Sequence, residues 1–318
     1  MKNKSEQYLF FAEAGKKVGM GHLFRTYNLC EKIKIKDKAI FLYENQTQLN
    51  FYKKKKVFHR SLNNISNLKS NALFIDSKRN RKDILKRYDG LFNKLVLIDN
   101  ETKLKDSANL IISPSYYSKS FKKKIRHGYH LSGFEYCILD KKINAIKRQN
   151  SNEFLISFGG EDPNNLTLKT LFLLKKLNLN NRCKVVLGPN YAHDLSKIKK
   201  LACNKKIFIS PSNIHKLFSS SSFVITAVGV TLQELFKLQV PSIIISNYKK
   251  DSADLKNISR YSKKYMGKNF TLSLGHYSDL SSKKLRNGIA KINNYKFHKD
   301  FPSESIGSKL DQILEIVQ

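Results

Sequence analysis

Short apolar runs alternate with longer amphipathic stretches along the chain, and this alternation restricts the possible folds more than any other feature. Runs of four or five apolar residues, without the polar alternation of a half-exposed strand, are typical of buried strands in a parallel sheet. In the first half, these runs are Tyr8–Ala12, Ala39–Tyr43, Ala72–Ile75, Leu95–Ile98 and Leu110–Ile112. The helical stretches between them are Leu23–Lys34, Gln46–Lys55 and Arg79–Arg87. The pattern predicts βαβ units with helices on both faces of a sheet.

A polar segment, Asp140–Asn152, separates this series from a second one. The second series of apolar runs is Phe154–Phe158, Lys184–Leu187, Ile207–Ile209, Phe223–Thr226 and Pro241–Ile245, and a helix near Glu304–Val317 closes the chain. A chain of 318 residues also exceeds the usual size of a single hydrophobic core. We therefore expect an α/β fold of two doubly wound Rossmann-like domains, 1–145 and 146–318, facing each other across a cleft. Ligands of such sheets bind outside the carboxyl ends of the strands.

The net charge of +34 fits several kinds of partner, namely nucleic acid, a membrane surface or an acidic ligand. Because the lysines are spread over the whole chain, we favour a general compositional bias and predict no specific nucleic-acid partner. The chain shows no signal-peptide pattern, and no apolar run approaches the ~18 residues needed to span a bilayer. We therefore expect a cytoplasmic protein without membrane insertion.

The cysteines and histidines indicate no metal and no cofactor. Cys30, Cys137, Cys183 and Cys203 lie far apart without C-x-x-C spacing, which fits neither a zinc site nor a disulfide framework. Free thiols of this kind imply a reducing compartment. The histidines do not show metal-ligand spacing either.

A glycine-flanked histidine follows the first predicted strand. Gly19-x-Gly21 begins like a dinucleotide-binding fingerprint, but Phe24 stands where the third glycine would be, so NAD binding is disfavoured. The turn lets backbone approach a ligand and places His22 at a helix start, with Arg25 one turn later on the same face. An imidazole is suited to proton transfer near neutral pH. The pattern predicts a general base beside an anionic substrate; alternatively, His22 only contributes a hydrogen bond at the helix N-terminus.

Two acidic residues end neighbouring strands of the first half. Asp76 and Asp99 each follow a buried run, which places them at the edge of the sheet where ligands bind. The alternative is that each of them caps a loop.

In the second half, a glycine pair marks another strand-to-helix connection. Gly159 and Gly160 end a strand, and a helix begins at Leu166, so free backbone N–H groups and the helix dipole could hold a phosphate. Glu161 and Asp162 follow the glycines. Asp162 precedes a proline and also fits a helix N-cap.

A third strand-to-helix connection contains Gly229, Thr231 and Glu234. Thr231-x-x-Glu234 has the spacing of a capping box, in which both side chains only bind backbone. In the functional alternative, Gly229 and Thr231 face a diphosphate and Glu234 accepts hydrogen bonds from ribose hydroxyls.

Together these motifs resemble the UDP-2,4-diacetamido-2,4,6-trideoxy-β-L-altropyranose hydrolases of pseudaminic acid biosynthesis and their spore-coat polysaccharide relatives. The resemblance covers nearly the whole chain, and the segments that carry it are Ala14–Arg25 (a G-x-G-H-x-x-R pattern), Ile75-Asp76, Ile98-Asp99, Leu131–Leu139, Ser157–Asn165 and Thr226–Pro241.

The resemblance implies a glycosyltransferase-B-like fold and a metal-independent, inverting hydrolysis of the anomeric C–O bond of a UDP-sugar. The partner is then a small-molecule UDP-sugar, held mainly by the second domain. His22 is implied as the residue that activates water. The residues implied on the sugar side are Glu13, Gly19, Gly21, Arg25, Asp76 and Asp99. The residues implied on the UDP side are Gly159, Gly160, Glu161, Asp162, Gly229, Thr231 and Glu234.

The chain departs from the family pattern at several strand ends. Phe11 and Glu13 replace an Arg-x-Asp, Lys78 replaces the tyrosine of an Asp-x-Tyr, and Asn100 replaces the second of two paired acids. An Asn-Gln pair after the Pro241–Ile245 run is missing. A glycosyltransferase that uses a UDP-sugar donor is therefore the second hypothesis. A binding protein with a degenerate site and a nucleic-acid binder are the others.

Overall fold

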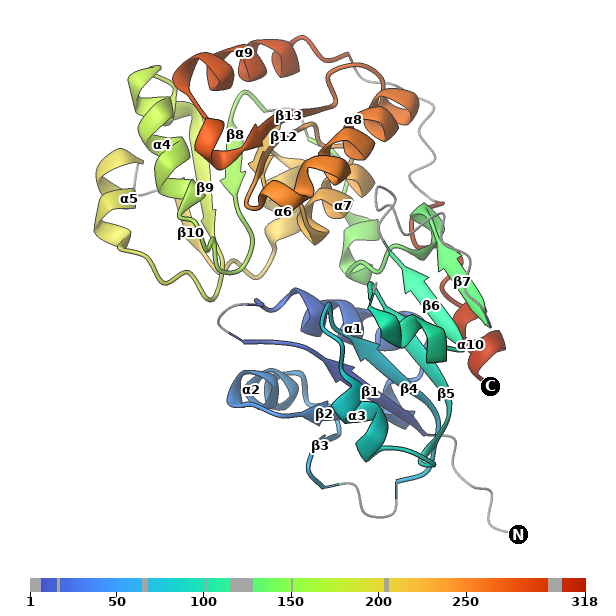
Figure 1. Ribbon diagram of the computed structural model, residues 1–318. Helices are drawn as coiled ribbons and strands as arrows, with labels where there is room; N and C mark the ends of the chain where they lie inside the picture. Colours follow the sequence, from blue (N-terminus) through green and yellow to red (C-terminus); the bar gives the residue numbers. More distant parts are fainter. Residues whose placement is uncertain are drawn as a thin grey trace. The chain divides into compact units, whose positions relative to one another are not determined.

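The computed structural model describes residues 7–15, 18–64, 68–100, 102–114, 128–149, 151–202, 206–296 and 305–318. Cys203 and Glu304, which the sequence analysis considered, lie outside these ranges. The chain forms two compact units, Met1–Lys141 with Ser305–Gln318, and Lys142–Glu304 (Figure 1). The predicted range 146–318 assigned the segment 305–318 to the second domain. In the structure this segment packs with the first unit, because Leu310, Ile313 and Val317 lie in the first unit's core.

The first unit contains a sheet of seven parallel strands within the described residues, in the order β3-β2-β1-β4-β5-β6-β7. The strands are β1 (Tyr8–Ala12), β2 (Ala39–Tyr43), β3 (His59–Ser61), β4 (Ser70–Asp76), β5 (Phe92–Ile98), β6 (Leu110–Ser113) and β7 (Tyr129–Ser132). The helices are α1 (Gly21–Lys32), α2 (Gln46–Lys55), α3 (Lys82–Arg87) and α10 (Gln312–Val317).

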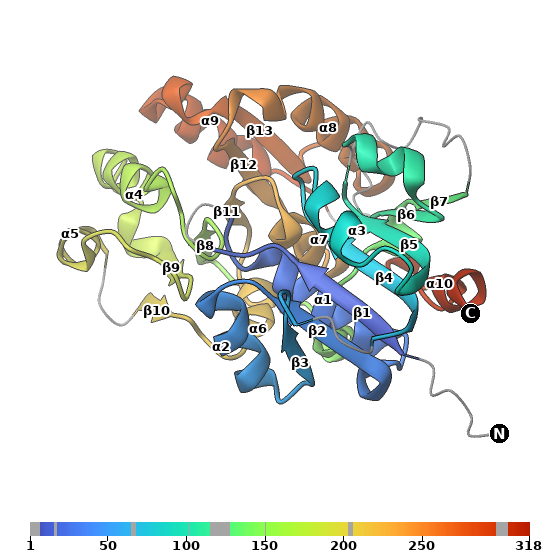
Figure 2. The ribbon, with the colours of Figure 1, turned by 60° about the horizontal axis from the view of Figure 1, so that its bottom comes forward.

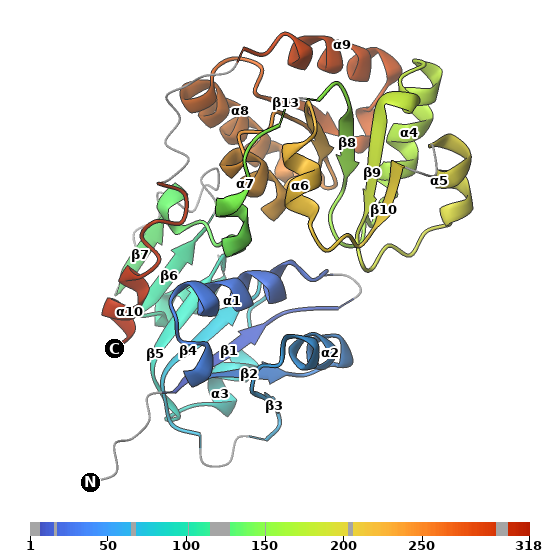
Figure 3. The same ribbon diagram turned by 180° about the vertical axis from the view of Figure 1, so that it is seen from behind.

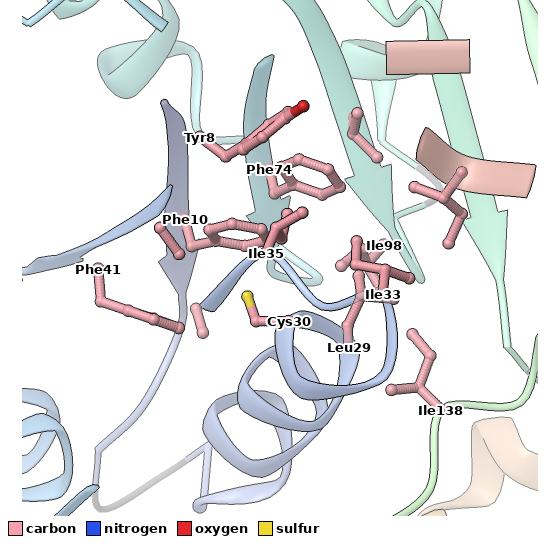
Figure 4. Packing of buried hydrophobic residues seen from close by; sticks show 14 of the residues in the cluster. Tyr8, Phe10, Leu29, Cys30, Ile33, Ile35, Phe41, Phe74, Ile98 and Ile138 are labelled. Atoms are coloured by element: carbon pink, nitrogen blue, oxygen red, sulfur yellow. The ribbon is translucent and has the colours of Figure 1, made fainter. Parts of the chain in front are cut away.

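Helices cover both faces of this sheet. The hydrophobic cluster on one face includes residues of α1, α2 and α10, and the cluster on the other face includes residues of α3. Figure 4 shows the first cluster, in which Phe10 of β1 stacks between Phe41 and Phe74 with ring-centroid distances of 5.5 and 4.3 Å. These ring contacts link three neighbouring strands, β2, β1 and β4, on the face of the sheet that α1 covers. Stacked pairs add about 0.5–1.5 kcal/mol each beyond their buried area.

The second unit contains six parallel strands among its described residues, in the order β10-β9-β8-β11-β12-β13. The strands are β8 (Phe154–Ser157), β9 (Cys183–Leu187), β10 (Ile207–Ile209), β11 (Val224–Thr226), β12 (Ser242–Ser246) and β13 (Thr271–His276). The helices are α4 (Leu166–Lys176), α5 (Leu195–Leu201), α6 (Ile214–Ser219), α7 (Val230–Lys237), α8 (Ser252–Met266) and α9 (Ser282–Asn293). α4, α5 and α9 pack on one face, and α6, α7 and α8 lie on the other (Figures 2 and 3).

Short 3-10 segments connect these elements. The described ones are η1 (Lys36–Lys38), η2 (Lys103–Ser107), η4 (Phe134–Tyr136), η5 (Lys141–Ala145), η6 (Asn180–Arg182), η8 (Lys249–Asp251) and η9 (Tyr277–Asp279). The polar segment Asp140–Asn152, which separated the two predicted series, contains η5 and connects the two units.

Each sheet has a point at which the strand order reverses direction along the chain. In the first unit it lies between β1 and β4, and in the second between β8 and β11. Ligands of doubly wound sheets bind at the carboxyl ends of the strands beside this point. The residues that follow β1, β4, β8 and β11 are therefore the candidates for ligand binding.

The predicted α/β architecture with two Rossmann-like domains is confirmed. The final helix is shorter than the predicted Glu304–Val317, because residues 306–311 form turns and α10 begins at Gln312. Its apolar stripe is nevertheless buried, since Leu310 and Ile313 both pack into the core.

Candidate functional site

His22 lies at the start of α1, directly beside the end of β4. β1 leads into the glycine turn, and Gly19 adopts a φ of 78°, a left-handed conformation that glycine tolerates best. Gly21 begins the helix and is exposed, and an added Cβ there would meet open space. In the sheet, Ala12 of β1 pairs with Asp76 of β4. This register brings the first turn of α1 to the last residue of β4, so His22 Nδ1 lies 2.5 Å from Asp76 Oδ1.

Asp76 is completely buried and uses both carboxylate oxygens within the protein. Oδ1 contacts His22 Nδ1 and accepts a hydrogen bond from Arg25 Nη2 at 2.6 Å. Oδ2 accepts hydrogen bonds from Arg25 Nε at 2.8 Å and Thr26 Oγ1 at 3.2 Å. A carboxylate has about four acceptor positions, and all four are used. Asp76 therefore orients its neighbours, and the predicted direct contact between Asp76 and substrate is not supported.

The charge of Asp76 determines the hydrogen positions on His22. Burial alone would raise the pKa of Asp76, but the neighbouring Arg25 and His22 outweigh it and lower this pKa below its usual range. An ionised carboxylate only accepts hydrogen bonds, so Nδ1 of His22 must carry the hydrogen. The 3.0 Å approach of Arg25 Nη2 to Nδ1 is then a close contact and not a hydrogen bond, because an Nδ1 that carries a hydrogen cannot accept another. In the neutral imidazole, Nε2 is then the nitrogen that can accept a proton.

Arg25 joins the two acids that the sequence placed at strand ends. Besides its two bonds to Asp76, its Nη1 donates to Asp99 Oδ2 at 3.0 Å. Burial works to lower the pKa of Arg25, but Asp76 and Asp99 more than compensate and raise it above its usual value. Arg25 is only 6% exposed. Its position favours a role in holding the network over direct substrate contact, and Asp99 remains the more accessible of the two acids.

The loop after β4, Ser77–Arg79, was not predicted as part of the site. Glu13 is buried, and its Oε2 accepts a hydrogen bond from Ser77 Oγ at 2.6 Å, while Arg79 pairs with the other carboxylate oxygen. Glu13 thus holds this loop from beneath, which replaces the predicted substrate contact with a structural one. The sequence signal was available, since Ser77–Arg79 follow a strand end at the reversal point of the sheet.

In the second unit, Asp162 caps α4. Its Oδ1 and Oδ2 accept hydrogen bonds from the backbone N–H groups of Leu166 and Thr167 at 2.7 and 2.8 Å. The capping alternative is therefore the one that forms. This carboxylate occupies the first N–H groups of α4, so the helix N-terminus is a poor anion site. The predicted phosphate contacts of Gly159 and Gly160 are separate from this cap.

Replacing Asp162 with alanine is expected to lower the free energy of unfolding by about 1–2 kcal/mol, because a helix cap with two charge-assisted bonds is lost. Urea denaturation measures this change. UDP affinity should stay at the wild-type level. Asp194→Ala, which removes the single cap bond to Ser196 N on α5, is the matched control with a smaller expected effect. A variant that keeps its stability but loses UDP affinity would contradict the capping role.

Gly159 and Gly160 form a turn that packs against a glycine the sequence analysis did not identify. An added Cβ on Gly188, just after β9, would lie 2.4 Å from both the carbonyl oxygen of Gly159 and the Cα of Gly160. Added Cβ atoms on Gly159 and Gly160 would meet nothing within 4 Å, so their outer side is open. Gly159 has a φ of 82°, a left-handed conformation suited to glycine.

Gly188→Ala is therefore expected to destabilise the protein by about 1–3 kcal/mol, since the backbone of the turn must move. The unfolding midpoint in urea measures the effect. Gly160→Ala is the control, with an expected change within ~0.5 kcal/mol, typical of a site without close neighbours. Equal stability of the two variants would show that this close approach does not constrain the turn.

At the start of α7, the predicted capping box does not form. The N-cap residue is Gly229, without a side-chain cap, and Thr231 is already the second helical residue. Glu234 instead contacts His215 of α6, with 3.0 Å between Oε1 and Nε2. The first turn of α7 contains no acidic residue. Both α4 and α7 begin beside the reversal point of the sheet. The first N–H groups of α4 are capped by Asp162, whereas no side-chain cap binds those of α7.

Further polar residues line the same strand ends. Asn164 Nδ2 donates to Asn247 Oδ1 at 3.0 Å, so the connections after β8 and β12 are linked. Asn247, which the sequence analysis did not identify, directly follows β12. Burial raises the pKa of Glu161, while a hydrogen bond from Asn190 opposes the rise. Oε1 of Glu161 is buried without a hydrogen-bond partner among the described residues.

No group of three His, Cys, Asp or Glu side chains that could hold a metal occurs in the described part of the chain. Across those same residues, no helix has the length and apolar character needed to cross a bilayer.

The two units define a glycosyltransferase-B-like fold, and comparison with solved structures supports this class. MurG of Acinetobacter baumannii superposes with a TM-score of 0.63 at 10% identity, covering 97% of this chain and 95% of that one. The forosaminyltransferase SpnP of spinosyn synthesis gives 0.62 at 9% identity, covering 99% and 96%. The UDP-GlcNAc 2-epimerase of Methanocaldococcus jannaschii gives 0.55 at 10% identity, covering 98% and 99%.

Sequence comparison identifies an uncharacterized protein of Methanocaldococcus jannaschii that is 25% identical over 256 residues. The match covers 72% of this chain and 53% of that protein, so this chain spans about half the length of the curated relative. No family model matches the chain.

Proposed function

We propose that this protein cleaves the anomeric C–O bond of a UDP-sugar, with His22 as the general base. The observation that carries the proposal is the His22–Asp76 pair at the reversal point of the first sheet. Asp76 fixes the ring through Nδ1, at 2.5 Å, and leaves Nε2 to accept a proton. A carboxylate that orients an imidazole in this way is a recurrent arrangement for general-base catalysis.

The mechanism assigns one proton transfer to His22. Nε2 removes a proton from a water molecule as the water oxygen attacks the anomeric carbon, and the bond from that carbon to the UDP oxygen breaks. Attack on the face opposite the leaving group inverts the anomeric configuration. UDP is a good leaving group, so a separate general acid is less necessary than in the cleavage of ordinary glycosides. A positioned base contributes about 10²–10⁴ in rate.

The diphosphate is assigned to the second unit. The uncapped N-terminus of α7 at Gly229 supports this assignment, because free N–H groups and the helix dipole favour anions. The outer side of Gly159 and Gly160 is open, so the diphosphate could also approach the backbone of this turn. The N-terminus of α4 is excluded from the assignment, since Asp162 occupies it. Glu234, held by His215, is the candidate partner for ribose hydroxyls.

For the sugar, the resemblance of the sequence motifs to the UDP-2,4-diacetamido-2,4,6-trideoxy-β-L-altropyranose hydrolases supports an amino-deoxy sugar. The pathway would then be nonulosonic acid or surface polysaccharide synthesis in the cytoplasm. The experiment is incubation of the protein with that UDP-sugar, without acceptor, followed by proton NMR. Release of UDP together with the inverted free sugar is the expected result. UDP binding without turnover, with or without an acceptor, would instead favour a binding protein.

Transfer of the sugar to an acceptor hydroxyl is the second candidate. The structures with similar folds include several named glycosyltransferases, such as SpnP, which favours it. The same base would then remove the proton from the acceptor hydroxyl instead of from water. Product formation that requires an added acceptor, with no UDP released in its absence, would identify the transferase.

A further inference from the structure

The loop after β4, Ser77–Arg79, is held by two buried residues, Asn100 at its backbone and Glu13 at its side chains. Asn100 is 3% exposed, and its Nδ2 donates to the carbonyl oxygens of Ser77 at 2.5 Å and Arg79 at 3.2 Å. Glu13, equally buried, accepts a hydrogen bond from Ser77 Oγ and pairs with Arg79 Nε. The backbone N–H of Arg79 also donates to Ser77 Oγ at 3.0 Å. The loop is therefore preorganised.

This loop belongs to the same network as His22. Asp76, which contacts His22, directly precedes Ser77. The Nζ of Lys78 lies 3.7 Å from Oδ2 of Asp99, and the same oxygen accepts a hydrogen bond from Arg25. Lys78 is thus linked to His22 through Asp99, Arg25 and Asp76.

The acidic and basic side chains at this edge of the sheet differ in their exposure to solvent. The side chains of Glu13 and Asp76 are 2% and 0% exposed, and that of Asp99 is 17% exposed. The side chains of Lys78 and Arg79 are 67% and 68% exposed. The three carboxylates and Arg25 are largely buried, and the two most exposed charges, Lys78 and Arg79, are both cations. A ligand at this edge therefore meets positive charge.

We propose that Lys78 and Arg79 bind an anionic substituent on the sugar of the substrate, so that the protein prefers an acidic nucleotide sugar to the neutral 2,4-diacetamido-2,4,6-trideoxy sugar that the sequence resemblance favours. The inference rests on the proposed function, because it assigns the sugar to this edge. Arg79 is anchored through Nε, which leaves its two Nη groups to donate to an anion. No partner of those groups occurs among the described residues. Lys78 adds a mobile point charge beside this fork.

A solvent-exposed lysine in a lysine-rich chain is ordinarily only a solvated group. Two observations distinguish this pair. The buried Asn100 donates to two backbone carbonyl oxygens of the loop, and the buried Glu13 holds the side chains of Ser77 and Arg79. Lys78 is also linked to the candidate base through Asp99, Arg25 and Asp76. Arg79, anchored in this way, loses little conformational freedom on binding, which increases the affinity that it provides.

The test compares UDP-glucuronate with UDP-glucose, two ligands that differ in one carboxylate, by isothermal titration calorimetry on the full chain. We expect the wild type to bind UDP-glucuronate about 10-fold more tightly, equivalent to ~1.4 kcal/mol. Lys78→Gln should reduce this ratio to about 2–3, within the range of one exposed ion pair. Lys78→Arg should retain the ratio. Lys86→Gln, an exposed lysine of α3, is the matched control and should leave it unchanged.

A nucleotide-free arm separates this inference from the proposed function. Methyl glucuronide, glucose 6-phosphate and methyl glucoside are titrated by NMR into the wild type and into Lys78→Gln, which also distinguishes a carboxylate from a phosphate. If UDP does not bind but the anionic sugars bind in a Lys78-dependent manner, the proposed function fails and the anion site stands. Without a preference for the anionic ligands in either arm, the inference is wrong. It is equally wrong if Lys78→Gln weakens UDP, UDP-glucose and UDP-glucuronate alike.

Discussion

Replacing His22 with glutamine is expected to lower kcat for UDP-sugar cleavage by about 10²–10⁴, the usual contribution of a positioned general base. Glutamine retains a polar group near Asp76, but it provides no nitrogen that can accept and release a proton near neutral pH. Since the base acts in the transition state, KM should change little. Steady-state kinetics with UDP release as the readout, together with calorimetric UDP binding, measure the two quantities separately.

The matched control is His59→Gln in the same unit. His59 lies on the edge strand β3, and its Nδ1 hydrogen-bonds to the carbonyl oxygen of Val57 at 2.8 Å. The kcat of the His59→Gln variant should remain at the wild-type value. A His22→Gln variant with kcat within about 3-fold of wild type, far below the usual effect of losing a base, would refute the assignment of His22.

The fold was predictable because buried parallel strands carry a strong local signal. Continuous apolar runs predicted Tyr8–Ala12 and Ala39–Tyr43 with the bounds that β1 and β2 have. The short edge strands β3 and β7 were not identified, since their residues are half-buried or exposed and mix polar with apolar side chains. The packing of 305–318 on the first unit could not be predicted either, because an apolar stripe does not specify the sheet that it covers.

The candidate site was predictable in its residue types but not in their roles. Strand ends and glycine turns identified His22, Asp76 and Asp99, and the structure brings these residues into one network through Arg25. Burial decides between a ligand contact and an internal one, and burial depends on the register between β1 and β4. For the same reason Glu234 could not be assigned from its capping-box spacing, because its partner His215 lies on another helix.

Replacing Asp76 with asparagine is expected to have the second large effect, on stability and on activity together. An amide offers one acceptor oxygen where four donor contacts now converge, and its NH₂ group faces N–H donors. Arg25 would remain buried with Asp99 as its one charged neighbour in the described network. Removing one partner of a buried ion pair usually costs about 3–5 kcal/mol. Urea denaturation at neutral pH measures this loss.

The activity of Asp76→Asn is expected to fall by about 10²–10⁴, since the hydrogen would no longer be held on Nδ1 of His22. An amide oxygen turned toward His22 preserves the tautomer but leaves the amide nitrogen against Arg25, so neither orientation restores the wild type. Nitrogen-15 NMR of the imidazole reports which ring nitrogen carries the hydrogen. A purely structural role for Asp76 would lower stability without changing this tautomer.

The pH dependence of stability provides an independent check on Asp76. Its folded-state pKa is lowered because Arg25 and His22 outweigh burial, so the ionised carboxylate stabilises the fold at any pH above its unfolded pKa of about 3.9. This contribution fades as the pH falls from there toward the lower folded-state pKa. The carboxylate's contribution to the stability deficit of Asp76→Asn should therefore be fully present above about pH 5 and shrink below about pH 4. Asp83→Asn removes an exposed carboxylate paired with Arg81 and should cost less than ~1 kcal/mol. An Asp76→Asn deficit that stays undiminished down to pH 3 would mean that the carboxylate is not held ionised by its neighbours.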